Sequence, residues 1–105
     1  MESSFTEIRN MITRIVKMTF EPHHANTFLQ VFESRKYLIA SFVGCKGVEL
    51  LRDIEKPNVF FTYSKWKDVA DLEKYRNSPL FTNTWAEVKP LFAARAEAWS
   101  VKNVE

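Results

Sequence analysis

Apolar and polar side chains alternate along residues 11–20 of the chain. Alternation with a period of two is typical of a β-strand, and the β-branched residues in this segment favour the same structure. The residues that would share one face of the strand are Ile12, Arg14, Val16, Met18 and Phe20. We therefore predict a first strand over residues 11–20.

The pattern changes to a helical period after Glu21 and Pro22. Proline is tolerated in the first turn of a helix, where its missing N–H has no intrahelical partner. Apolar side chains then recur at roughly helical spacing, at Phe28, Leu29, Phe32, Leu38, Ile39 and Phe42. We predict a helix that begins at Glu21-Pro22 and ends before Gly44, a residue suited to a left-handed helix stop.

Two further strands and a second helix follow this first helix. Residues 46–52 and 59–66 have strand character, and residues 53–58 between them are typical of a turn, so we predict a β-hairpin. Asp68 then stands where it can cap a helix over residues 69–76.

The last part of the chain predicts one more helix and one more strand. Ser78 is suited to cap the helix, because a proline follows it in the first helical position. Apolar residues then recur at steps of three or four, at Phe81, Trp85, Val88 and Phe92. Pro90 predicts a break near Lys89, and alternation over residues 96–101 predicts the final strand.

The predicted order of elements is β-α-β-β-α-α-β, a split βαβ arrangement. We expect an α+β, ferredoxin-like fold with one antiparallel sheet and helices on one of its faces. The other face also carries apolar side chains, and such a face must be buried against something. A second copy of the same sheet is the simplest cover, so we expect a C2 homodimer whose sheets form a dimeric α/β barrel. We assign residues 11–105 to this single domain and residues 1–10 to a flexible extension.

Charge and composition narrow the classes of partner. The 15 basic and 13 acidic residues are interleaved and leave a formal net charge of +2, without the clustered basic face of a nucleic-acid-binding protein. No apolar run approaches the roughly 20 residues that cross a bilayer. The lone cysteine, Cys45, cannot form an internal disulfide. We expect a cytoplasmic protein that binds neither nucleic acid nor membrane.

Several kinds of chemistry have no matching motif in this sequence. Gly44 and Gly47 are its only glycines, so it has no glycine-rich phosphate loop. His23 and His24 are adjacent at the start of the predicted first helix, which is a weak arrangement for binding a metal and is more typical of exposed residues. A nucleophilic-serine motif and a flavin or nicotinamide fingerprint are also missing. We therefore expect any oxidation to need no bound cofactor or metal.

The segment 59–81, VFFTYSKWKDVADLEKYRNSPLF, combines a strand that ends on tryptophan with a short helix and a Ser-Pro-x-Phe restart. This order resembles the antibiotic biosynthesis monooxygenase (ABM) family, and the resemblance extends over residues 11–101. It implies a dimeric barrel that holds a small aromatic or quinol-like ligand between sheet and helices. It also implies oxidation of that ligand by dioxygen, for which the protein binds the ring, stabilises its anion and excludes water.

The resemblance places the site near the end of the third strand. The predicted lining residues are Trp66, Phe81, Trp85 and Val16. Tyr75 or Arg76 would stabilise the anion, although the ordinary pKa of tyrosine, about 10, makes Tyr75 a poor general base. Arg14 is a further possible anion stabiliser. Four of these residues also have a plainer interpretation: Trp66 as a core residue, Tyr75 as packing, and Arg14 and Arg76 as surface charges.

Four positions depart from residues that are common in the family. Many members carry histidine at the places of Tyr75 and Leu80, and heme-degrading relatives carry their iron-ligating histidine at the place of Trp85 and asparagine at that of Val16. Tryptophan cannot ligate iron, so the resemblance argues against heme. The more apolar pocket keeps two alternatives open. One is a non-catalytic small-ligand-binding module in stress response or signalling, and the other is an isomerase of a small signalling molecule.

Overall fold

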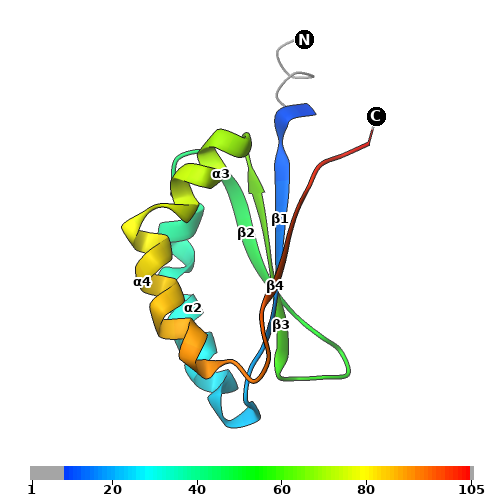
Figure 1. Cartoon of the computed structure of the whole chain (residues 1–105), viewed down its shortest axis with the longest axis vertical. Helices are drawn as coiled ribbons and strands as arrows, with labels where there is room; N and C mark the ends of the chain where they lie inside the picture. Colours follow the sequence, from blue (N-terminus) through cyan, green and yellow to red (C-terminus); the bar gives the residue numbers. More distant parts are fainter. Residues whose placement is uncertain (1–8, 105) are drawn as a thin grey trace.

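The computed structural model describes residues 9–104, in which the helices lie on one face of an antiparallel sheet (Figure 1). The predicted extension, residues 1–10, lies mostly outside the described residues. Along the chain the elements are β1 (Ile12–Thr19), η1 (Pro22–His24), α2 (Ala25–Ala40), β2 (Cys45–Arg52), β3 (Val59–Trp66), α3 (Val69–Arg76), α4 (Pro79–Val88), η2 (Lys89–Leu91) and β4 (Glu97–Val101).

The four strands are arranged in the order β2-β3-β1-β4, and all neighbours are antiparallel. The predicted α+β, ferredoxin-like fold is therefore confirmed. In the register of β1 with β3, Arg14 lies opposite Ser64 and Met18 lies opposite Phe60. These residues belong to the face that the helices cover, which we call the inner face.

The connection between β2 and β3 shows why this part of the chain turns. The Asp53 carboxylate accepts hydrogen bonds from the backbone N–H groups of Glu55 and Lys56, at 2.8 and 2.9 Å. These bonds favour the charged form and lower the pKa of Asp53. The backbone N–H of Asp53 also donates to the carbonyl of Val59 at 2.9 Å, so the predicted hairpin is confirmed.

The first helical segment begins differently from the prediction. Residues 22–24 form a 3-10 turn, and the α-helix starts only at Ala25. The His24 N–H bonds to the Glu21 carbonyl at 2.8 Å, which is the tighter i→i+3 pattern of a 3-10 turn. Gly44 follows the helix with φ +82°, so the left-handed residue lies in the connection to β2 and not directly at the helix end.

Side-chain caps mark the start of α3 and the junction between α3 and α4. The Asp68 carboxylate accepts the N–H of Asp71 at 2.8 Å at the start of α3. The Ser78 hydroxyl accepts the N–H of Phe81 at 3.2 Å and donates to the Tyr75 carbonyl at 2.6 Å. One hydroxyl therefore ends one helix and begins the next, as the Ser-Pro pattern predicted, and the break at Lys89 is confirmed.

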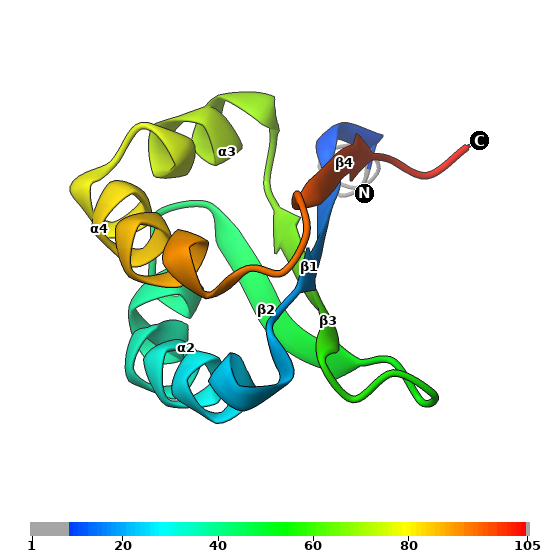
Figure 2. The ribbon, with the colours of Figure 1, turned by 60° about the horizontal axis from the view of Figure 1, so that its bottom comes forward.

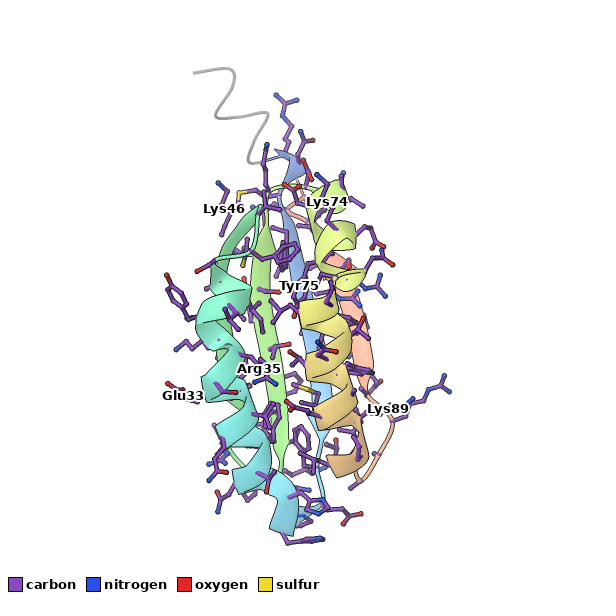
Figure 3. The ribbon with its side chains drawn as sticks, turned by 90° about the vertical axis from the view of Figure 1, so that its left-hand side faces the viewer. Glu33, Arg35, Lys46, Lys74, Tyr75 and Lys89 are labelled. Carbon is purple, nitrogen blue, oxygen red and sulfur yellow. The ribbon has the colours of Figure 1, made fainter. Side chains whose placement is uncertain are left out.

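The core between sheet and helices is divided into two clusters. The larger cluster consists of Met18, Phe20, Phe28, Phe32, Phe60 and Val88. The smaller one, at the other end of β1, consists of Ile12, Trp66 and Leu72. Figure 3 shows α2 and α4 side by side over the inner face of the sheet.

The opposite, outer face of the sheet is not covered by any helix within residues 9–104 (Figure 2). Ile15 lies there between Tyr63 on β3 and Trp99 on β4 in the sheet register. Trp99 is 44% exposed, and neighbouring Val101 is equally exposed. None of the helices in the described part of the chain is both long and apolar enough to cross a membrane.

Candidate functional site

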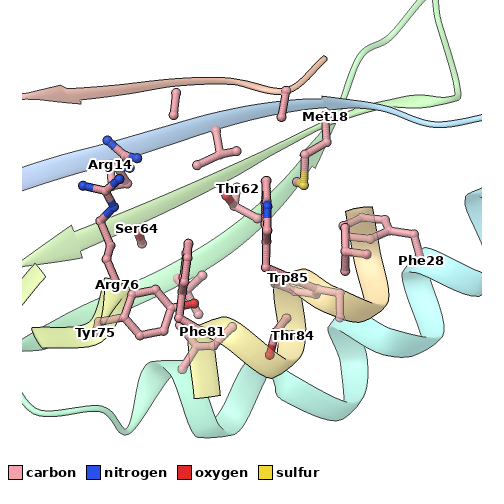
Figure 4. A pocket seen from close by; sticks show the side chains of 17 residues that line it. Arg14, Met18, Phe28, Thr62, Ser64, Tyr75, Arg76, Phe81, Thr84 and Trp85 are labelled. Atoms are coloured by element: carbon pink, nitrogen blue, oxygen red, sulfur yellow. The ribbon is translucent and has the colours of Figure 1, made fainter. Parts of the chain in front are cut away.

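A cavity of about 350 Å³ lies between the inner face of the sheet and helices α2 and α4 (Figure 4). A volume of this order is typical of small-molecule sites. Its wall is made of Arg14, Val16, Met18, Phe28, Phe32, Ile39, Val48, Thr62, Ser64, Tyr75, Arg76, Phe81, Thr84, Trp85, Val88, Ala96 and Ala98.

The strand and helix periodicities in the sequence explain which residues form most of this wall. Alternate residues of β1, namely Arg14, Val16 and Met18, share the inner face. On α4 the residues Phe81 and Trp85 are one helical turn apart, and both reach the cavity. Their rings are nearly parallel and stacked, with centroids 5.9 Å apart and planes 7° apart, and both contribute apolar surface to the wall.

Tyr75 closes one part of the cavity from α3. Its ring stacks on Trp66 at 4.9 Å, and it meets the edges of Phe42 and Phe81 at 5.5 and 5.3 Å. Burial, assisted by the nearby Cys45, raises the pKa of Tyr75 to about 12. The phenol is therefore neutral at physiological pH, where it can donate a hydrogen bond but cannot act as a base.

Trp66 lies behind Tyr75 and outside the cavity wall formed by the described residues. Its side chain is fully buried, and its indole N–H donates to the Ser64 hydroxyl at 3.0 Å. The indole N–H is thus already paired within the protein. Trp66 acts on the cavity indirectly, because it supports the ring of Tyr75.

Two guanidinium groups lie at one end of the cavity, Arg14 from β1 and Arg76 from α3 (Figure 4). Arg14 donates to the Ser100 hydroxyl of β4 at 2.9 Å, and Arg76 donates to Glu73 at 3.0 Å. Burial lowers the pKa of Arg14, and the charge of Arg76 lowers it further while Glu73 opposes the change. Met18 and Phe28 lie at the other end, so the cavity has one cationic and one apolar end.

The comparison with protein families decides the relationship of this chain. The family model described as antibiotic biosynthesis monooxygenase matches residues 11–87, which is most of the chain. The protein belongs to the ABM family. No curated protein sequence matches the chain.

Solved structures share the fold of this ABM-family protein. A conserved protein from Methanosarcina mazei superposes with a TM-score of 0.89 at 16% identity, over 95% of this chain and 99% of its own. PA3566 from Pseudomonas aeruginosa gives 0.82 at 19% identity, over 93% and 98% of the two chains. A structure named as an antibiotic biosynthesis monooxygenase gives 0.84 at 16% identity, over 90% and 99%. At these identities the likeness establishes the fold alone.

The structure brings most of the predicted site residues of this ABM-family protein together. Val16, Tyr75, Arg76, Phe81 and Trp85 all line the cavity, whereas Trp66 packs behind it. The adjacent rings of His23 and His24 are at η1, before α2. Within residues 9–104 no group of three or more potential metal ligands is found.

Sequence reasoning gave too little weight to Arg14 and did not single out Thr84. Arg14 shares the inner face with Val16 and Met18, and this period could have identified it. Thr84 lines the cavity, and its buried hydroxyl has no hydrogen-bond partner among the described residues. It is three residues after Phe81 on the predicted helix, which is the helical spacing that could have indicated the same wall.

Proposed function

We propose that this ABM-family protein is a cofactor-independent monooxygenase that oxidises a small aromatic or quinol-like molecule with dioxygen. The observation that carries the proposal is the cavity itself, in which an apolar wall with the paired rings of Phe81 and Trp85 ends at hydrogen-bond donors. A flat ring fits such a wall, and donors at its end stabilise negative charge on a ring oxygen.

Oxidation of a phenol to a quinone requires no reductant besides the substrate. The phenol loses its hydroxyl proton to solvent water, and the phenolate passes one electron to dioxygen. The ring radical and superoxide then combine to form a carbon–oxygen bond at a ring carbon that carries hydrogen. Uptake of a proton and loss of water, which removes that hydrogen, leave the second carbonyl. One oxygen atom enters the product and the other leaves as water.

Each part of the cavity has a role in this scheme. Tyr75, as a neutral phenol, donates a hydrogen bond to the substrate oxygen, and Arg76 stabilises its negative charge. Val16, Phe81 and Trp85 hold the ring and exclude water from the radical pair. Ser64, which already accepts the indole N–H of Trp66, keeps the adjoining wall in place.

The test is dioxygen uptake by chelator-treated protein given a panel of hydroquinones and polycyclic phenols, with heat-denatured protein as blank. We expect uptake that depends on native protein. Tyr75→Phe should lower turnover by about tenfold or more, because the hydrogen-bond donor at the anion is lost. Tyr37→Phe is the matched control, since Tyr37 is 79% exposed on α2. No uptake across the panel by folded protein would contradict the oxygenase proposal.

A second candidate is a non-catalytic module that binds a small apolar ligand. It is favoured by one observation: the cavity wall formed by described residues contains no histidine, carboxylate or lysine that could remove a proton. Tight binding of a ring ligand without any product under air would support this candidate over the oxygenase.

We also propose that the protein is a cytoplasmic homodimer, assembled through the outer face of the sheet. The half-exposed aromatic side chain of Trp99 beside Ile15 supports the dimer, because a contiguous apolar face is stabilised when a partner covers it. The unpaired Cys45 is consistent with a reducing compartment.

A further inference from the structure

The cavity has charged residues at one end only, and both of them are cationic. Arg14 and Arg76 are the only charged residues among the described residues that line it, and they approach that end from opposite walls, one from β1 and one from α3 (Figure 4). Each is held in place by one hydrogen bond, Arg14 by Ser100 and Arg76 by Glu73.

Two like charges at one end of a largely apolar cavity repel each other, which favours a bound anion between them. The charged groups that act on Arg14 are Arg76 and Glu73. Glu73 provides a single carboxylate, and it does not belong to the cavity wall. One positive charge is therefore left over at this end, and a bound anion would balance it. Guanidinium groups suit this task, since their planar donors match the two oxygens of a delocalised oxyanion.

The cavity has no group that could create this anion from a neutral ligand. Its described wall contains no imidazole, carboxylate or amine, and the phenol of Tyr75 holds its proton up to a pH of about 12, which is its pKa. A ligand that must be ionised therefore has to lose its proton in water, before it enters. This requirement favours carboxylates and acidic ring hydroxyls over ordinary phenols, which are ionised to a smaller extent in neutral water.

We propose that Arg14 and Arg76 together bind the oxyanion of an apolar ring acid that is already ionised in neutral water. The chemical class is a ring of two or three fused members with either a carboxylate or an acidic, vinylogous ring hydroxyl. The inner face from Arg14 to Met18 covers four residue-to-residue steps of the strand, about 13 Å, which suits a ligand of that length. The inference rests on the proposed function for the location of the site, and it narrows the substrate class.

The orientation of such a ligand follows from exposure. The side chain of Arg76 is 40% exposed, so the cationic end is the one that meets solvent. Met18, Phe28 and Val88 at the other end are buried in the larger core cluster. The oxyanion would therefore lie near solvent between the two guanidinium groups, with the ring directed inward along Phe81 and Trp85.

The experiment compares anions with neutral molecules of the same shape by titration calorimetry. The probes are naphthoate with naphthamide, and hydroxynaphthoquinone with methoxynaphthoquinone, at constant ionic strength. We expect at least one anion to bind about tenfold or more tightly than its neutral partner. The pair that shows the preference identifies the source of the oxyanion, a carboxylate or a ring oxygen. Equal affinity within both pairs would overturn the inference.

Variants test whether the two arginines cause the preference. Arg14→Gln and Arg76→Gln should each reduce it by about tenfold, whereas Arg14→Lys and Arg76→Lys should retain part of it. Arg95→Gln is the charge-matched control, since Arg95 is exposed and outside the described cavity wall. A thermal melt of each variant checks its fold. A preference that is unchanged in both glutamine variants would overturn the assignment to this pair.

These outcomes are independent of the test of the oxygenase. An anion preference without dioxygen uptake would support the binding inference and contradict the oxygenase proposal. Dioxygen uptake with neutral quinols, combined with equal affinity for anions and neutral partners, would do the opposite.

Discussion

At the scale of single residues, the stacked side chains of Trp66 and Tyr75 have different roles, one in the core and the other at the cavity. Trp66 is fully buried and its N–H is bonded to Ser64, so it belongs to the core. Tyr75 stacks on it but also reaches the cavity. Both interpretations of each residue were open from the sequence, because a strand-end tryptophan and a helical tyrosine are common in cores and in pockets alike.

The raised pKa of Tyr75 leads to a prediction about pH. The unfolded chain releases the tyrosine proton near pH 10, and the folded chain keeps it to about pH 12. Tyr75 therefore stabilises the fold fully below pH 10, and between pH 10 and about 12 this contribution falls by roughly 1.4 kcal/mol per pH unit. Ultraviolet absorbance of phenolate should show a late titration that is lost in Tyr75→Phe and kept in Tyr37→Phe. The same late titration in Tyr75→Phe would refute the assignment.

At the scale of elements, the junction of α3 and α4 determines how the cavity is walled. The Ser78 hydroxyl forms hydrogen bonds with both helices. Tyr75 on α3 and Phe81 on α4 lie on either side of this junction, and their ring centroids are 5.3 Å apart. The Ser-Pro pair predicted this junction from the sequence alone. Capping is a local interaction, so its signal is visible in neighbouring residues.

Loss of this cap should weaken both the fold and the wall. We expect Ser78→Ala to lower the free energy of unfolding by about 1 kcal/mol, since the N–H of Phe81 and the carbonyl of Tyr75 both lose a partner. Urea denaturation measures the change. Thr82→Ala, an exposed position on the same helix, should stay within about 0.5 kcal/mol of the native protein. Equal effects of the two substitutions would show that the cap has no special role.

At the scale of the whole molecule, the two faces of the sheet differ in what covers them. The inner face has α2, α3 and α4 above it, while Ile15, Tyr63 and Trp99 share the outer face, which the helices in residues 9–104 leave uncovered. The sequence indicated that both faces of the sheet carry apolar side chains, because each of the two alternating sets of residues along β1 includes apolar ones. The sequence could also predict that apolar side chains need a cover, but it could not identify the cover.

The proposed dimer is tested by a single charge on the outer face. We expect the native protein to have the mass of a dimer at micromolar concentration in analytical ultracentrifugation. Trp99→Glu should give a monomer, because a carboxylate would lose its water in the interface without gaining a partner. Ile54→Glu is the control, as Ile54 is 99% exposed in the turn after β2. A native monomer, or a dimeric Trp99→Glu variant, would rule out this interface.

The sequence by itself determined the elements, their order, the inner and outer positions of each strand and the family. These properties depend on the hydrophobic period and on capping, which act over a few residues. Only the tertiary structure decided that the space inside is a cavity with one cationic end, that Trp66 stands behind it and that Arg14 reaches it beside Arg76. Arg14 and Arg76 are far apart in the sequence, and they meet because β1 lies inside the sheet while α3 folds back over it. Such a meeting is set by strand order and helix packing, which no local pattern encodes.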